Sequence, residues 1–350
     1  MSEKVRVGVV GVGDFGRHHV RIYRGLPEAE LVGVFDTNRG RAEQIAHEHG
    51  TRAFGSLEEL GRAVAAASVA VPTRAHARVG GELLAAGVDV LVEKPMAASL
   101  AEADELLATA RASQRILQVG HTERFNPAVA AAARVVTTPL FFEVHRLGGF
   151  PGRSLDVDVI YDVMIHDLDI VLSFVGSEPS KVRAVGIPIL SPKVDIANAR
   201  LEFASGCVAN LTASRVSTEK VRKLRFFQPG QYVSLDFTRQ DALLIRVAGS
   251  QPAAAGRPGA AGRPGALGQP RPEGSGRDQP ELSFEQLSTQ PEEPLVAELR
   301  AFVTAVRTRQ PGPVTGEEGR RALAVATRVA RAIAEHAQKV PAATFPAMKA

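Results

Sequence analysis

A short glycine-rich turn near the N-terminus constrains the fold of this chain more than any other feature. A β-branched run, Val5 to Val10, leads directly into Gly11-Val12-Gly13-Asp14-Phe15-Gly16, and a helix-like stretch follows from Arg17 to Arg24. Between a strand and a helix, three glycines at this spacing permit a tight turn, close approach of a pyrophosphate and close packing of helix on strand. The N-terminus of the helix then faces the negative charge of the phosphates. The segment therefore predicts a parallel α/β domain that binds a dinucleotide.

An acidic residue stands at the end of the next expected strand. The run Leu31 to Phe35 leads into Asp36, twenty residues after Gly16. A carboxylate at this position accepts hydrogen bonds from the adenosine ribose and repels a 2′-phosphate, which favours NAD over NADP. Two alternatives stay open, because Arg39 could hold such a phosphate and Asp36 could instead cap the following helix.

Strands and helices alternate up to about residue 120, which predicts a doubly wound sheet. The further strands expected in this part are Ser68–Val71, Val88–Val92 and Ile116–Val119. The expected helices are Arg41–His49, Ser56–Ala66 (opened by a capping box from Ser56 to Glu59), His76–Ala86 and Leu100–Ala112. We therefore assign residues 1–121 to an NAD(P)-binding Rossmann domain.

Beyond residue 121, strand-like runs follow one another with little helix between them. The expected strands are Leu140–Arg146, Val182–Ile189, Asp195–Phe203, Cys207–Arg215, Val221–Phe227 and Gln231–Asp236. The expected helices are Asn126–Val136, Val157–Val175, Leu295–Arg309 and Glu317–Gln338. This order predicts an α+β domain over residues 122–350, with a large, mostly antiparallel open sheet. We expect this domain to bind the substrate and to form the oligomer. Residues 251–279 are rich in Ala, Gly, Pro and Arg, and we predict a disordered low-complexity insertion there.

Charge, cysteine content and hydropathy argue against nucleic-acid binding, an internal disulfide and a membrane span. The formal net charge is +4, and residues 251–278 supply +2 of it from four arginines against two acidic residues, so the remainder is nearly neutral and nucleic-acid binding is not expected. The single cysteine, Cys207, excludes an internal disulfide. We expect no signal peptide, because Ser2-Glu3-Lys4 leads directly into the first strand, and no apolar run reaches the roughly 20 residues that span a bilayer. These features predict a cytoplasmic protein that does not enter the membrane.

The tripeptide Glu93-Lys94-Pro95 closes the apolar run Val88 to Val92, which has the length and composition of a buried parallel strand. Ligands of open α/β sheets bind outside the carboxyl ends of the strands, so Lys94 would project toward such a ligand. A lysine at this position is costly to desolvate unless it has a partner or a role. Lys94 is therefore either an ordinary charged residue of a loop or part of the functional site.

A second group of chemically capable residues lies between Asp156 and Asp169, where five aspartates surround His166. On an α-helix, Asp162 and His166 are four residues apart and share a face. A solvent-exposed pair conflicts with the apolar residues around most of the helix, and a metal site lacks a second histidine at ligand spacing. The pattern favours an acid/base pair in which Asp162 orients the imidazole and raises its basicity.

Taken together, these motifs resemble the glucose–fructose oxidoreductase, inositol dehydrogenase and MocA (Gfo/Idh/MocA) family over nearly the whole chain. The three markers are the glycine turn from Gly11 to Gly16, the Glu93-Lys94-Pro95 tripeptide and the Asp162/His166 helix, in that order. Met164 departs from the glycine that many members carry two residues before the histidine. The segments His121–Pro127 and Met164–Asp169 are similar to the branch that oxidises the 3-hydroxyl of UDP-N-acetylglucosamine ahead of a partner aminotransferase.

The resemblance implies an NAD-dependent sugar dehydrogenase acting on a CH–OH group. His166 is expected to be the base, with Asp162 orienting it and Lys94 stabilising the charge that develops on the substrate oxygen. Lys94 could instead be the base itself if burial depresses its pKa. His76 either approaches the cofactor or caps its helix, and we favour the cap.

The resemblance also implies a set of binding residues and partners. The expected cofactor-binding residues are Gly11, Val12, Gly13, Asp14, Phe15, Gly16, Asp36, Thr37, Arg39, Val71, Pro72, Thr73, His76, Glu93 and Lys94. The expected substrate contacts are Lys94, His121, Arg124, Asn126, Arg146, Arg153, Asp162 and His166, with no metal. A homodimer or homotetramer is expected through the open sheet. The alternatives are a dehydrogenase of free sugars or inositols, and a non-catalytic sensor of NAD or sugar on the same fold.

Overall fold

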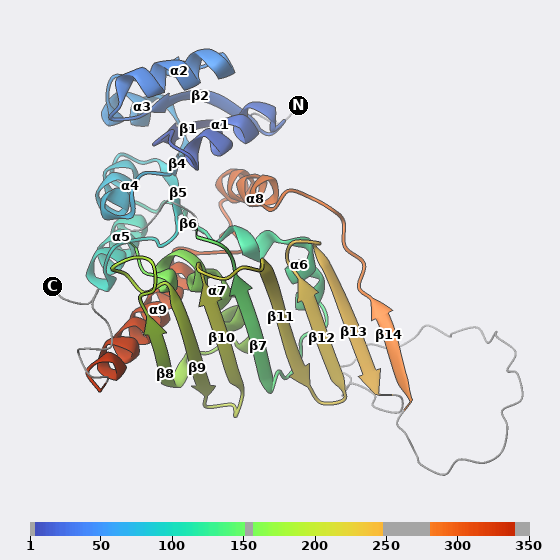
Figure 1. Cartoon of the computed structure of the whole chain (residues 1–350). Helices are drawn as coiled ribbons and strands as arrows, with labels where there is room; N and C mark the ends of the chain where they lie inside the picture. Colours follow the sequence, from blue (N-terminus) through green and yellow to red (C-terminus); the bar gives the residue numbers. More distant parts are fainter. Residues whose placement is uncertain (1–3, 151–156, 248–280, 340–350) are drawn as a thin grey trace, which may run out of the picture.

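Two sheets, one above the other in Figure 1, organise the molecule. The computed structural model describes residues 4–150, 157–247 and 281–339. The predicted insertion at residues 251–279 and the predicted substrate contact Arg153 lie outside this range. Within it, no helix combines the length and the apolar character needed to cross a membrane.

The first sheet is fully parallel, with strand order β3-β2-β1-β4-β5-β6. Its strands are β1 (Val5–Val10), β2 (Ala29–Phe35), β3 (Arg52–Ala53), β4 (Ala66–Val69), β5 (Asp89–Glu93) and β6 (Leu117–Gly120). The connecting helices are α1 (Gly16–Gly25), α2 (Arg39–His49), α3 (Leu57–Ala63), η1 (Thr73–Ala75), α4 (His76–Ala85) and α5 (Leu100–Ala112). The direction of winding reverses between β1 and β4, which is where a doubly wound sheet binds its ligand.

The helices of this half begin and end where the sequence predicts, with small differences. Ser56 accepts a hydrogen bond from the amide of Glu59 and opens α3, although the Glu59 carboxylate bonds to Gly55 rather than completing the box. Gly50 ends α2 in the left-handed conformation, at a φ of 59°. Strand β3 is not predicted from the sequence, because a strand of two residues has too little pattern to be recognised.

The second sheet has eight strands in the order β14-β13-β12-β11-β7-β10-β9-β8. They are β7 (Phe141–Leu147), β8 (Pro179–Ile187), β9 (Ile196–Phe203), β10 (Val208–Ser214), β11 (Val221–Gln228), β12 (Gln231–Asp236), β13 (Asp241–Val247) and β14 (Leu282–Gln286). Every neighbouring pair is antiparallel except β7 with β10. With the parallel first sheet, this arrangement confirms the predicted fold class.

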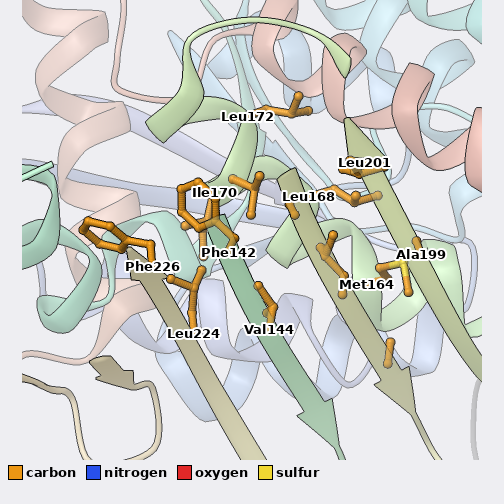
Figure 2. Close-up of a cluster of buried hydrophobic side chains, with 14 of the residues drawn as sticks. Phe142, Val144, Met164, Leu168, Ile170, Leu172, Ala199, Leu201, Leu224 and Phe226 are labelled. Carbon is orange, nitrogen blue, oxygen red and sulfur yellow. The ribbon is translucent and has the colours of Figure 1, made fainter. Parts of the chain in front are cut away.

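Helices cover one face of the second sheet, behind the strands in Figure 1. They are α6 (Pro127–Ala133), the π-helical segment η3 (Ile160–Met164), α7 (Ile165–Val175) and α9 (Gly316–Ala337). Figure 2 shows Leu168 and Ile170 of α7 above Phe142 and Val144 of β7 and Phe226 of β11, and all five belong to one buried cluster. Along β7, buried and partly exposed residues alternate strictly, so one face of the sheet forms this core while the other stays without helices.

The chain returns to the first sheet at its C-terminal end. Leu299 and Phe302 of α8 (Pro294–Thr308) are buried in the same cluster as Val7 and Val20. On α9, a Cβ at Gly319 would lie 2.4 Å from Val119 of β6, so only glycine allows this approach. Helices α8 and α9 thus pack against the first sheet. The predicted domain limits, residues 1–121 and 122–350, stay a prediction.

Candidate active site

Lys94 and Asp162 join the first sheet to the helix layer of the second. Lys94 follows β5, and its Nζ donates hydrogen bonds to the backbone oxygen of Asp162 at 2.6 Å and to Asp162 Oδ1 at 3.2 Å. Asp162 belongs to η3. Because the Lys94 side chain is only 12% exposed, its charge is largely removed from water and depends on this partner.

The structure corrects the partner that the sequence analysis gave to His166. Asp162 was expected to orient the imidazole from four residues earlier, as on an α-helix. In η3, however, the amide of Ile165 bonds to the carbonyl of Ile160, five residues back. The backbone of this segment is therefore π-helical and not α-helical. Asp162 pairs with Lys94 instead, and His166 Nδ1 is buried with no hydrogen-bond partner among the described residues.

His166 and His121 are two uncharged imidazoles near Lys94. Burial lowers the pKa of His166 well below its usual value, and the charges of Lys94 and Arg146 lower it further. The His121 ring meets the His166 ring edge-on, with centroids 6.2 Å apart. Burial lowers the pKa of His121 as well, and neither of its nitrogens has a partner within the described part of the chain. Both rings can therefore accept a hydrogen bond or a proton from a substrate hydroxyl.

Glu93 is the last residue of β5, directly before Lys94, and its carboxylate is held by His19, which was not predicted from the sequence. Its Oε1 is 3.0 Å from Nε2 of His19, which is fully buried on α1. Burial acts to raise the pKa of Glu93, but the hydrogen bond and charge of His19, followed by the charge of Lys94, keep it below the usual value. A Cβ on Gly120 would lie 2.9 Å from Glu93 Oε1, so the carboxylate fills the space between the ends of β5 and β6.

The glycine turn after β1 has the shape that a pyrophosphate requires. Gly11 has a φ of 82°, and a Cβ there would lie 2.6 Å from the carbonyl oxygen of Ala70. A Cβ on Gly16 would overlap the carbonyl oxygen of Gly11. At Gly13, by contrast, a Cβ would meet only the Nη1 atom of Arg41, at 3.6 Å. No side chain caps the start of α1, so the turn and the helix N-terminus fit a dinucleotide.

Asp36 ties the end of β2 to the glycine turn. Its Oδ2 accepts a hydrogen bond from the amide of Val12 at 2.9 Å, and Asn38 rather than Asp36 caps α2. The alternative of a capping role for Asp36 is therefore wrong. Arg39 pairs with Glu43 on the exposed side of α2, whereas Arg41, which the sequence analysis did not single out, lies 3.9 Å from Asp36 Oδ2.

The loops after β4 and β5 are linked by His76. The predicted capping role for His76 is wrong, because Ala75 is the N-cap of α4 and no side chain caps this helix. The His76 ring is buried, with Nε2 2.8 Å from the carbonyl oxygen of Val71 and Nδ1 2.8 Å from that of Pro95. The other expected cofactor contacts follow the carboxyl ends of β1, β2 and β4: Val12, Asp14, Phe15, Thr37, Pro72 and Thr73.

Arg124 and Asn126, two of the predicted substrate contacts, have hydrogen-bond partners within the protein. Arg124 binds both carboxylate oxygens of Asp169, at 2.9 and 2.7 Å, and its Nη1 bonds to Glu318 of α9 at 3.2 Å. Asn126 is buried, caps α6 and donates to the backbone oxygen of Phe237. The contacts of Arg124 and Asn126 with the substrate therefore stay a prediction.

Arg146 is also held by partners within the protein, and its contact with the substrate stays a prediction. Its Nε and Nη2 bond to Asp167, its Nη1 bonds to Glu123 at 2.7 Å, and its guanidinium lies 4.8 Å from the centre of the Phe237 ring. The side chain is 5% exposed. Asp167 and Asp169, which the sequence analysis left without a role, are the buried partners of Arg146 and Arg124.

Other buried groups complete the surroundings of the site. Glu298 of α8 accepts a hydrogen bond from Thr122 at 3.0 Å, and burial, with the charge of Glu93, raises its pKa well above the usual value. His19 and Glu298 each fall on the buried side of a helix, and this signal could have marked them as paired or uncharged. In the described ranges, no three His, Cys, Asp or Glu side chains come together to hold a metal ion.

Two family models match the chain. Residues 5–121 match the NAD-binding Rossmann fold of the Gfo/Idh/MocA oxidoreductase family, and residues 150–228 match the C-terminal domain of the same family. The protein is a member of the Gfo/Idh/MocA family. It is therefore an NAD-binding oxidoreductase, and the predicted family, cofactor and class of enzyme are confirmed.

Several characterised members of the Gfo/Idh/MocA family are similar to this chain. The UDP-N-acetylglucosamine 3-dehydrogenase of Acidithiobacillus ferrooxidans is 37% identical over 337 residues, which cover 96% of this chain and 99% of that protein. A crystal structure of that enzyme aligns with a TM-score of 0.83 at 34% identity, covering 95% of this chain and 98% of the other. The scyllo-inositol 2-dehydrogenase (NAD(+)) of Bacillus subtilis is 31% identical over 62% of this chain and 69% of its own length.

Proposed function

We propose that this protein oxidises the 3-hydroxyl of UDP-N-acetylglucosamine to the 3-keto sugar, with NAD as the hydride acceptor. The observation that carries the proposal is the identity of 37% with a UDP-N-acetylglucosamine 3-dehydrogenase across almost the full length of both chains. The inositol dehydrogenase relative matches a shorter part of the chain. The residues near Lys94 supply the groups that oxidation of a sugar hydroxyl requires.

Removing hydrogen from a secondary alcohol takes a hydride from carbon and a proton from oxygen, and bound NAD accepts the hydride. His166 is the proposed base, since its lowered pKa leaves the ring neutral near pH 7 with an unpaired nitrogen. Lys94 has three N–H donors. Two of them point at Asp162, which leaves one for the substrate oxygen as it gains negative charge.

Asp162 therefore has a different proposed role from the one that the sequence predicts. It fixes Lys94 through its carboxylate and its backbone oxygen, and it does not raise the basicity of His166. His121, unpaired and next to His166, is proposed to hydrogen-bond the sugar. This division favours His166 as the base over Lys94, because the lysine is already held by a carboxylate.

On the cofactor side, the proposed contacts follow the geometry of the turn. The open backbone at Gly13 and the uncapped start of α1 receive the pyrophosphate. The Asp36 carboxylate, 9% exposed at the end of β2, accepts the ribose hydroxyls and disfavours the 2′-phosphate of NADP. Glu93 supports Lys94 from the buried side and contacts His19.

The test is to measure NADH formation by the purified protein with UDP-N-acetylglucosamine, with NADP, free N-acetylglucosamine and myo-inositol as controls. A 2-oxo acid is included to recycle cofactor that stays bound. We expect turnover with the nucleotide sugar and NAD alone. Turnover only with free sugars or inositols would show that the enzyme is a dehydrogenase of free sugars or inositols. If NAD binds but no substrate is oxidised, the result would favour a non-catalytic sensor of NAD or sugar.

We also propose that the open face of the second sheet binds a second copy of the chain. An apolar row crosses this face at paired register positions: Phe141, Phe227, Tyr232, Ile245 and Phe284. The Phe227 and Tyr232 rings stack at 4.8 Å, and Phe284 is 66% exposed. Such a row on a face without helices is typical of an interface.

We further propose that the protein is cytoplasmic and that an aminotransferase consumes its keto product.

Tyr232→Asp tests this interface, because a charge in the centre of the apolar row must lose its hydration on association. We expect the mass in solution, measured by light scattering after size-exclusion chromatography, to fall to that of one chain. Ile189→Asp is the matched control, since Ile189 is 52% exposed but lies beyond the row. An unchanged mass for Tyr232→Asp, or a monomeric parent protein, contradicts the proposal.

A further inference from the structure

Arg222 differs from the other arginines around the active site. It lies on β11, directly opposite Arg146 in the register with β7, and therefore on the same helix-covered face. Its side chain is 43% exposed, against 5% for Arg146 and 13% for Arg124. Its charge also contributes, after burial, Lys94, Arg146 and His121, to lowering the pKa of His166.

The guanidinium of Arg222 has no hydrogen-bond partner among the residues that the structure describes. The nearest carboxylate oxygen, Oε1 of Glu123, is 3.8 Å from Arg222 Nη1, which is too long for a hydrogen bond. The same oxygen already accepts from Arg146 Nη1 at 2.7 Å. Arg146 and Arg124 bind their own carboxylates at short range. Within the part of the chain that the structure describes, Arg222 is thus a cation near the site whose guanidinium makes no hydrogen bond.

We infer that Arg222 binds the diphosphate of a nucleotide-sugar substrate and so selects nucleotide sugars over free sugars. The inference rests on the proposed function and adds a specificity-determining residue to it. A planar guanidinium fits phosphate oxygens with two parallel hydrogen bonds. The diphosphate is attached to the sugar ring that reacts at His166. The residue that binds the diphosphate must therefore lie near His166, but outside the place where the sugar ring reacts. A free sugar or an inositol has no anion to occupy Arg222.

The variants Arg222→Gln and Arg222→Lys test the inference in the NAD-loaded enzyme. Hydrogen bonds to charged groups contribute enough that losing them weakens binding by roughly 10- to 100-fold. We expect Arg222→Gln to raise KM for UDP-N-acetylglucosamine by about this factor, with a much smaller change in kcat. Arg222→Lys keeps the charge without the planar fork and recovers part of the affinity.

Binding of UDP, measured by calorimetry, gives a readout that does not depend on turnover. UDP affinity should fall by a similar factor in Arg222→Gln and stay unchanged in Arg225→Gln. Arg225 is the matched control, since it lies on the same strand but faces the opposite side, where it pairs with Glu143 at 3.1 Å.

The two possible failures are distinguishable. If the parent enzyme oxidises UDP-N-acetylglucosamine and Arg222→Gln keeps its KM and its UDP affinity, the role of Arg222 is overturned while the proposed function stands. If the parent enzyme neither binds UDP nor oxidises the nucleotide sugar, the proposed function fails, and the inference about Arg222 fails with it.

Discussion

Replacing either Lys94 or His166 by alanine is expected to lower kcat by about 10²- to 10⁴-fold while NAD binding stays near that of the parent protein. His166→Ala removes the unpaired nitrogen that takes the proton, and Lys94→Ala removes the cation that faces the developing charge. Neither side chain belongs to the glycine turn after β1, which is the main contact proposed for the cofactor. NAD affinity is measured by calorimetry and kcat by NADH formation at saturating substrate.

Matched controls come from the open face of the second sheet. His145 and Lys223 are paired in the register of β7 with β11 and face away from the site, so His145→Ala and Lys223→Ala should keep kcat within about twofold. Near-parental rates in Lys94→Ala and His166→Ala would show that the site has been assigned to the wrong residues. Loss of NAD binding in Lys94→Ala would assign this lysine to the cofactor site, and loss of NAD binding in His166→Ala would show that the substitution disturbs the fold.

The pH profile of the parent enzyme belongs to the same prediction. The base must be neutral to accept a proton, and burial lowers the pKa of His166 well below 6.5. The acidic limb of kcat/KM should therefore fall below pH 6.5, because His166 stays neutral as the pH drops through that value. A limb at or above pH 6.5 that is lost in His166→Ala would contradict the uncharged state of this ring.

The second large effect is expected on stability, from Arg146→Met. The change leaves Asp167 buried without its partner and frees Glu123 from its shortest contact. Breaking a buried ion pair from one side costs about 3–5 kcal/mol, because a charge remains in a medium that solvates it poorly. The free energy of unfolding from a denaturant titration measures this loss.

The same variant separates the structural role of Arg146 from the predicted substrate contact. A substrate contact would raise KM and leave the unfolding free energy nearly unchanged. Arg225→Met is the control, since its ion pair with Glu143 is exposed to about 40% on both sides and should contribute less than about 1 kcal/mol. Equal stability losses in the two variants would contradict the buried network.

The difference between sequence and structure at this site has a specific physical origin. The glycine turn, Glu93-Lys94-Pro95 and the histidine helix were recognisable because each lies beside a strong strand or helix pattern. The partner of each charged side chain was not, because pairing depends on the tertiary contacts that bring Asp162 next to Lys94 and on the packing of α7 against β7. Neither feature produces a periodic pattern of residues in the sequence.

The strands that escaped prediction have a similar explanation. On β13, both faces carry apolar residues, such as Leu243 and Leu244, so the two-residue alternation is weak. On β14, all five residues are exposed, as expected for a strand at the edge of a sheet. The remaining strands of the second sheet alternate clearly and were predicted to within a few residues.

The central claim is that hydride leaves carbon 3 of the sugar, and the fate of the hydrogen on that carbon tests it most directly. UDP-N-acetylglucosamine deuterated at carbon 3 is mixed with excess enzyme and NAD, and both products are analysed by mass spectrometry after a single turnover. The account predicts deuterated NADH and a keto sugar without deuterium. Unlabelled NADH with the deuterium retained in the sugar would mean that another carbon is oxidised, and it would contradict the account.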